Sequence, residues 1–80
     1  MATTLQLVLR RTLARAIKTR VESWRVTREA AAMKLGVTRP RLSALVAEEV
    51  TLFSLDTLVT LAAKAGLTIR ISATRRYRRT

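Results

Sequence analysis

The side chains of this sequence that could do chemistry are almost all cationic. Lysine and arginine number 16 against five aspartate and glutamate residues, and the formal net charge at pH 7 is +11. Histidine and cysteine are both absent, so the commonest general base, the commonest metal ligand and any thiolate nucleophile are missing. The carboxylates are not spaced like the ligands of a hard-cation loop; they are Glu22, Glu29, Glu48, Glu49 and Asp56. We therefore expect no catalytic residues, no cofactor and no metal site.

The excess of positive charge predicts a polyanionic partner. Most of the cations are arginines, whose planar guanidinium matches phosphates and guanine edges better than the ammonium of lysine does. Double-stranded DNA is the partner that we expect. A cationic membrane-binding or RNA-binding protein is the alternative from another class, but a membrane binder needs one continuous basic amphipathic helix, whereas glycines and caps interrupt the helices here.

The cellular location that we expect depends on membrane-spanning and targeting signals. No stretch approaches the roughly 18 consecutive apolar residues that cross a bilayer. In MATTLQLVLRR the charges follow the apolar residues, which is the reverse of a secretory signal, whereas the late first acidic residue, Glu22, leaves an organelle transit peptide open. We expect a cytoplasmic, nucleoid-associated protein with no membrane contact.

A long amphipathic helix is predicted at the start of the chain, with Thr3 or Thr4 as its N-cap. Its apolar residues recur every four positions, with Ala16 and Trp24 beside them: Leu5, Leu9, Leu13, Ile17 and Val21. The opposite side carries cations, which we interpret as a solvated surface: Arg10, Arg11, Arg15, Lys18 and Arg20. Because leucines also alternate with period two over residues 4–9, a strand stays open there, although we favour a helix.

Two short helices joined by a tight turn are predicted within 27–46. Thr27 caps an alanine-rich helix over 28–35, Gly36 ends it in the left-handed conformation, and Thr38 caps the next helix almost at once. Ala32, four residues before Gly36, is small enough to let the two helices approach. We expect apolar contacts between them from three leucines, Leu35, Leu42 and Leu45. This pattern is typical of a DNA-binding helix-turn-helix, although an ordinary helical hairpin contains the same elements.

The remainder of the chain predicts one more helix, a strand and a tail. After a connector over 48–53, Ser54 caps a helix that Gly66 ends. The apolar face of this helix consists of Leu55, Leu58, Val59, Leu61 and Ala62. The sequence therefore divides into a domain over 1–72 and a basic tail over 73–80.

A strand over 67–71 is predicted because Leu67, Ile69 and Ile71 alternate with polar residues. One strand cannot satisfy its own backbone groups, so we expect it to pair with the same strand of a second subunit. Such a homodimer would set two recognition helices about one DNA turn apart on a palindromic operator. The tail supplies candidate phosphate contacts at Arg75, Arg76, Arg78 and Arg79.

The stretch TREAAAMKLGVTRPRLSALV, followed by LFSLDTLVTLAAKAG, resembles the XRE (Cro/C1-type) helix-turn-helix family over roughly Leu13 to Ile71. Within that family it is similar to HigA-like antitoxins and to small phage or prophage regulators. The resemblance implies an all-α, lambda-repressor-like domain of four to five helices, to which the sequence adds the C-terminal dimerisation strand. It also implies that six residues line the DNA: Arg28, Arg39, Pro40, Arg41, Ser43 and Ala44.

The helical wheel of 39–46 agrees with this implied surface. Opposite the apolar side lie the small residues Pro40, Ala44 and Ala47, with Arg41 and Ser43 beside them, and Arg39 extends from the helix start after the Thr38 cap. A nearly flat face of this kind lets a helix enter the major groove, where an arginine can bind a guanine and Ala44 can contact a thymine methyl. Thr27 and Arg28 begin the preceding helix, where an N-terminus favours a phosphate.

The sequence departs from the family pattern in two places. Ala47, Glu48 and Glu49 stand where the family often has Arg-Gly-Lys, so the glycine C-cap and the phosphate-binding bases are lost. The two acids either pair with nearby arginines or turn this loop away from the duplex. Arg28 replaces a common glutamine and keeps a phosphate role. The sequence thus predicts a dimeric transcriptional repressor, either an antitoxin of a toxin–antitoxin pair that represses its own promoter and binds a cognate toxin, or a phage or prophage regulator.

Overall fold

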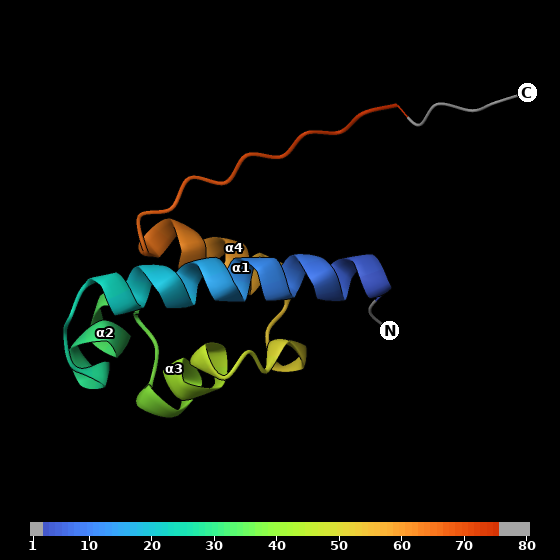
Figure 1. Ribbon diagram of the computed structural model, residues 1–80. Helices are drawn as coiled ribbons and strands as arrows, with labels where there is room; N and C mark the ends of the chain where they lie inside the picture. The colour runs from blue at the N-terminus through green and yellow to red at the C-terminus, as the bar shows by residue number, and fades with distance from the viewer. Residues whose placement is uncertain (1–2, 76–80) are drawn as a thin grey trace, which may run out of the picture.

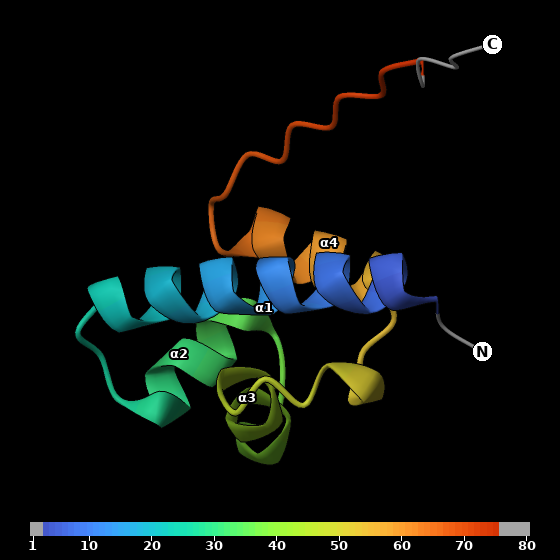
Figure 2. The same ribbon diagram turned by 45° about the vertical axis from the view of Figure 1, so that its right-hand side comes forward.

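Four α-helices and one 3-10 helix form in residues 3–75, the part of the chain that the computed structural model describes. They are α1 (Thr4–Ser23), α2 (Arg28–Leu35), α3 (Arg39–Val46), η1 (Val50–Leu52) and α4 (Leu55–Lys64). The long α1 runs the length of the body with α4 beside it, and α2 and α3 lie on one side of this pair (Figure 1; Figure 2). The C-terminal segment leaves on the opposite side. The predicted all-α fold is confirmed.

The helices begin at the residues that the sequence predicts as caps. Thr3 and Gln6 form a capping box, in which the Gln6 N–H donates to Thr3 Oγ1 over 3.1 Å and the Thr3 N–H donates to Gln6 Oε1 over 3.0 Å. This box starts α1 at Thr4, so residues 4–9 are helical and the strand alternative is wrong. Three hydroxyls cap the later helices, those of Thr27, Thr38 and Ser54.

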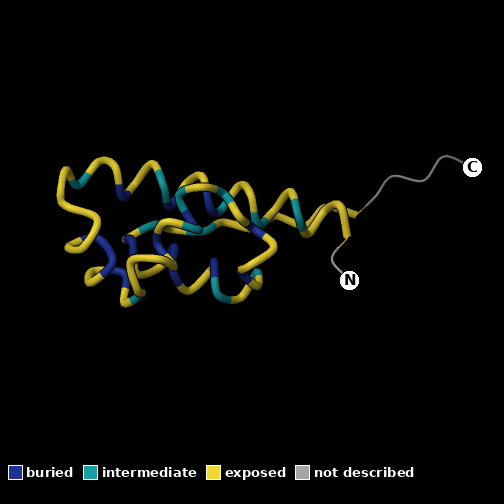
Figure 3. Tube along the Cα trace, turned by 90° about the horizontal axis from the view of Figure 1, so that it is seen from below, coloured by how far each residue is buried: buried dark blue, intermediate teal, exposed yellow. Residues whose placement is uncertain are grey.

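The core contains one large side chain that the sequence pattern places in a connector. Phe53 is 1% exposed, and it precedes the Ser54 cap while Leu58, 0% exposed, lies one turn into α4. Apolar residues at these two positions form a hydrophobic staple, which fixes how the chain enters a helix. The other fully buried large side chains come from α1, α2 and α3: Ile17, Leu35, Leu42 and Leu45. Buried positions gather where the helices meet, whereas the C-terminal segment and much of the N-terminal part of α1 are exposed (Figure 3).

The apolar stripe predicted along α1 is only partly correct. Ile17 and Val21 are buried together with Ala14, but Leu5 is 66% and Leu9 is 43% exposed. An α-helix turns about 100° per residue, so a repeat of four drifts by about 40° at each step and winds around the helix. The N-terminal leucines therefore lie on a different surface from the core residues.

The predicted strand over 67–71 is not present in the described residues, where 67–75 has no helix or strand. Leu67 donates the last backbone hydrogen bond of this part of the chain, to the Ala62 carbonyl over 2.9 Å. Leu67 and Ile69 pack against the core, whereas Ile71 is 87% exposed. A strand needs a second strand to complete its ladder, and no described segment of this chain offers one. The tail residues Arg76, Arg78 and Arg79 lie outside the described residues.

None of the helices within 3–75 combines the length and the apolar character of a membrane-spanning helix.

Candidate nucleic-acid interface

The turn between α2 and α3 has the predicted tight geometry. Gly36 adopts φ 72° and ψ 32°, and the Val37 N–H behind it donates to the Ala32 carbonyl over 2.9 Å. A Cβ at position 36 would lie 3.3 Å from Lys64 Nζ. The Lys64 ammonium ends a flexible side chain and can move aside, so the left-handed backbone is what requires glycine here.

The contacts that hold α2 against α3 are also as predicted. Leu35 and Leu42 are 0% exposed, Leu45 is 1% exposed and Ala32 is 3% exposed. Thr38 caps α3 through its hydroxyl, which accepts from the Arg41 N–H over 3.3 Å. The helix pair is therefore fixed by buried apolar contacts on one side, which leaves the other side of α3 in solvent.

The exposed residues of α3 and its C-cap are Arg39, Pro40, Arg41, Ser43 and Ala47. We call four of them, Arg39, Pro40, Ser43 and Ala47, the reading face. Three of the four side chains are small, so the backbone of α3 can approach another surface closely. Ala44, predicted to contact bases, is half-buried and packs against the core. The chain continues from Ala47 into Glu48, so one end of the reading face meets an acidic residue.

Arg41 is held in a different way from Arg39. Its guanidinium lies 4.2 Å from the centroid of the Phe53 ring and donates from Nη1 to the Leu52 carbonyl over 3.1 Å. Both partners follow α3 in the chain, so Arg41 connects α3 to the segment around η1. Arg39 is exposed and has no hydrogen bond or ion pair within the described residues. Of the two arginines predicted to read bases, the structure leaves Arg39 free and engages Arg41.

The start of α2 lies in solvent as well. Thr27 and Arg28 are exposed, and the Thr27 hydroxyl accepts from the Ala30 N–H over 3.1 Å. A hydroxyl that accepts this bond still has its own hydrogen to donate. With Arg28 beside it, this end of α2 has the groups that bind a phosphate oxygen.

A family model for a helix-turn-helix domain matches residues 1–74. The chain belongs to this helix-turn-helix family. Searches of curated proteins and of solved structures found no match. The family match agrees with the α2-turn-α3 geometry and indicates a DNA-binding regulator.

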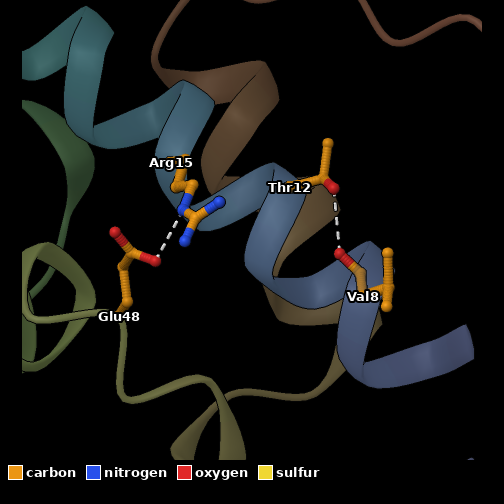
Figure 4. A network of polar contacts seen from close by, with 4 residues as sticks. All are labelled: Val8, Thr12, Arg15 and Glu48. Atoms are coloured by element: carbon orange, nitrogen blue, oxygen red, sulfur yellow. Dashed lines mark hydrogen bonds and ion pairs between the residues drawn. The ribbon is translucent and has the colours of Figure 1, made fainter. Parts of the chain in front are cut away.

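The sequence predicts that the cations of α1 form a solvated surface. Three of its arginines differ from that prediction, because two contact other parts of the domain and one is partly buried. Arg15 Nε lies 2.8 Å from Glu48 Oε1 and connects α1 to the loop after α3 (Figure 4). Arg20 Nε donates to the Ala65 carbonyl over 3.0 Å at the end of α4, where a cation complements the helix dipole. Arg10 is half-buried, and its Nε is buried without a hydrogen-bond partner in the described residues.

Glu48 takes the left-handed position at the end of α3 where the family often has a glycine, so the end of the helix is still capped. Its backbone is left-handed, with φ 59°, and the Glu49 N–H donates to the Ala44 carbonyl over 3.0 Å. A residue with a Cβ in this region costs roughly 1–2 kcal/mol, and the exposed ion pair with Arg15 offsets part of that. Pairing with an arginine, one of the two roles left open by the sequence, is the one found.

Proposed function

We propose that this helix-turn-helix domain is a sequence-specific transcriptional repressor that binds a palindromic operator as a homodimer. The observation that carries the proposal is the reading face, where small side chains surround Arg39 on a helix held by buried contacts. Arg39 has no hydrogen bond or ion pair within residues 3–75. Such a helix fits into the major groove and brings Arg39 to base edges. Bound at a promoter, the dimer would repress transcription by occluding it.

The residues of the interface divide by role. We assign Arg39 to a guanine edge, with Pro40 and Ser43 beside it on the groove floor. Thr27, Arg28 and Thr38 lie at the starts of α2 and α3 and are assigned to phosphates. Ala44 and Arg41 were predicted on the same surface. Ala44 packs against the core, which supports a DNA contact at the margin of the reading face. Arg41 contacts Phe53 and the Leu52 carbonyl, which supports a role in positioning α3. Cations of the tail, from Arg75 onward, are assigned to phosphates flanking the site.

Dimerisation through Leu67, Ile69 and Ile71 belongs to the same proposal. The resemblance of roughly Leu13 to Ile71 to XRE-type regulators of the HigA-like group supports an antitoxin that represses its own promoter and binds a toxin. A phage or prophage regulator is the alternative setting, and the gene next to this one distinguishes the two.

Selection from a pool of random DNA duplexes tests the proposal and identifies the operator in the same experiment. We expect enrichment of two inverted half-sites whose centres lie about one helical turn, roughly 10 base pairs, apart. Affinity for the selected duplex should fall linearly with the logarithm of salt concentration, with a slope near −0.9 per phosphate contacted and roughly −5 or steeper for a dimer. Recovery of unrelated sequences, or binding that salt does not weaken, would contradict the proposal.

A further inference from the structure

Arg10 occupies a position of α1 at which the helix otherwise contributes apolar residues to the core. Residues three or four positions apart lie on the same side of an α-helix. Leu7, three positions before Arg10, packs against the core, and Ala14 and Ile17, four and seven positions after it, are 1% and 0% exposed. Arg10 is therefore directed toward the interior side of α1, unlike Arg11, the exposed arginine next to it.

The guanidinium of Arg10 is partly removed from water without a partner in residues 3–75. Its Nε is buried and makes no hydrogen bond there, and the one ion pair of this part of the chain joins Arg15 to Glu48. An arginine that only covers apolar surface with its methylene groups keeps its charged end in water. A buried donor without an acceptor lowers the stability of a protein, and the loss is greater for a charged group. The position therefore favours an acceptor from outside these residues.

The interior side of α1 at Arg10 faces the side of the molecule that carries α3. Helix α1 packs against both α3 and η1. In Figures 1 and 2, η1, drawn in yellow, lies below the N-terminal half of α1, on the side where α2 and α3 lie. Arg41 borders η1 from α3, because it contacts the Leu52 carbonyl and the Phe53 ring. Arg10 and Arg41 thus bring two cations to the segment that follows α3.

A duplex that receives α3 in its major groove brings a phosphate backbone to this segment. The groove is about 12 Å wide, so the two strands that border it pass close to either side of an inserted helix. Because η1 follows α3 in the chain and packs against it, η1 lies at one of these borders. A guanidinium suits a phosphate at this place, since its planar N–H groups match two phosphate oxygens at once.

We infer that Arg10 binds a phosphate of the DNA backbone beside η1. This inference rests on the proposed function, to which it adds a contact from α1, outside the helix-turn-helix unit. The phosphate supplies the acceptor that the guanidinium lacks in the free chain. Because a backbone phosphate carries no sequence information, Arg10 contributes to the affinity for every duplex and not to the choice of operator.

Arg10→Met, compared with Arg11→Met, tests this contact. Methionine keeps a long, unbranched side chain that packs in irregular spaces, and it removes the charge. Arg10→Met should raise the urea midpoint of the free protein, because it removes an unpaired buried donor. Arg11→Met removes an exposed arginine and should leave the midpoint unchanged.

The same variants are then titrated with the selected duplex and with a scrambled duplex. At about 0.1 M salt, Arg10→Met should weaken binding to both duplexes alike, by about 10-fold for each chain bound. The plot of log affinity against log salt concentration should become flatter by about 0.9 per chain. Arg11→Met should keep the wild-type slope.

Three results would overturn the inference. Equal losses of affinity and slope in Arg10→Met and Arg11→Met would show that net charge alone explains the effect. A lower urea midpoint in Arg10→Met would show that the guanidinium already has a partner in the free chain. If inorganic phosphate raises the melting temperature of wild type but not of Arg10→Met, while both bind DNA with the same slope, the site holds a free phosphate and not the duplex.

Failure of the proposed function is recognised separately. If selection recovers no operator, sequence-specific repression is contradicted, but the two variants are still compared on the scrambled duplex. A flatter slope for Arg10→Met alone then supports the phosphate contact. A wild-type chain that binds no duplex at all contradicts both.

Discussion

Replacing Phe53 by alanine is expected to destabilise the folded chain by about 3–5 kcal/mol. Phe53 is 1% exposed, it forms a staple with Leu58, and its ring carries the guanidinium of Arg41. The truncation therefore leaves a cavity beneath η1 and also releases the contact that connects α3 to this segment. Small domains are stable by only roughly 5–15 kcal/mol, so a large fall in the urea midpoint should be measured.

Leu52→Ala is the matched control for Phe53→Ala. Leu52 precedes Phe53 directly but is 54% exposed, so its truncation should change the free energy of unfolding by no more than about 0.5 kcal/mol. Equal destabilisation by the two substitutions would show that the segment around η1 does not pack as described.

Arg39→Ala is expected to weaken binding to the selected duplex by roughly 5-fold to 150-fold, which corresponds to the 1–3 kcal/mol of a bidentate arginine–guanine contact. Because Arg39 has no partner within the described residues, its loss should leave the free energy of unfolding almost unchanged. Affinity for a scrambled duplex should fall much less, so the ratio of the two dissociation constants is the quantity to measure.

Two further arginines serve as controls for this ratio. Arg11 is exposed on α1 and has no hydrogen bond or ion pair within 3–75, so Arg11→Ala removes the same charge and should leave the ratio unchanged. Arg41→Ala should mainly lower stability, by about 1 kcal/mol, because it removes the contacts with Phe53 and Leu52. If Arg41→Ala changes the ratio and Arg39→Ala does not, the roles that we assign to the two residues are reversed.

Local signals were enough to predict the helix boundaries and the α2-turn-α3 unit. Threonine and serine caps act within three residues of their position, and Gly36 adopts the left-handed backbone that other residues reach only with strain. The contacts of Leu35, Leu42 and Leu45 follow from helical period and the shortness of the turn. Each of these features depends on residues that are close together in the sequence, so each can be predicted from the sequence alone.

The partners of the arginines could not be predicted in the same way. Arg20 and the Ala65 carbonyl are 45 positions apart, and Arg15 and Glu48 are 33 apart. A periodic pattern shows that an arginine lies outside the apolar stripe, but not which distant group it meets. The strand predicted at 67–71 is not found in the described residues, because alternating apolar residues do not show whether a second strand lies alongside.

An amide chemical-shift map of the protein with the selected duplex tests the central claim most directly. If α3 reads the DNA, the largest changes should appear at the amides of residues 27–30, 38–39 and 41–43, at the starts of α2 and α3. The exposed apolar residues of α1 and α4, Leu5, Leu9 and Val59, should change little. Changes confined to α1 and residues 67–75, with α3 unaffected, would contradict the claim that this helix-turn-helix recognises DNA through its reading face.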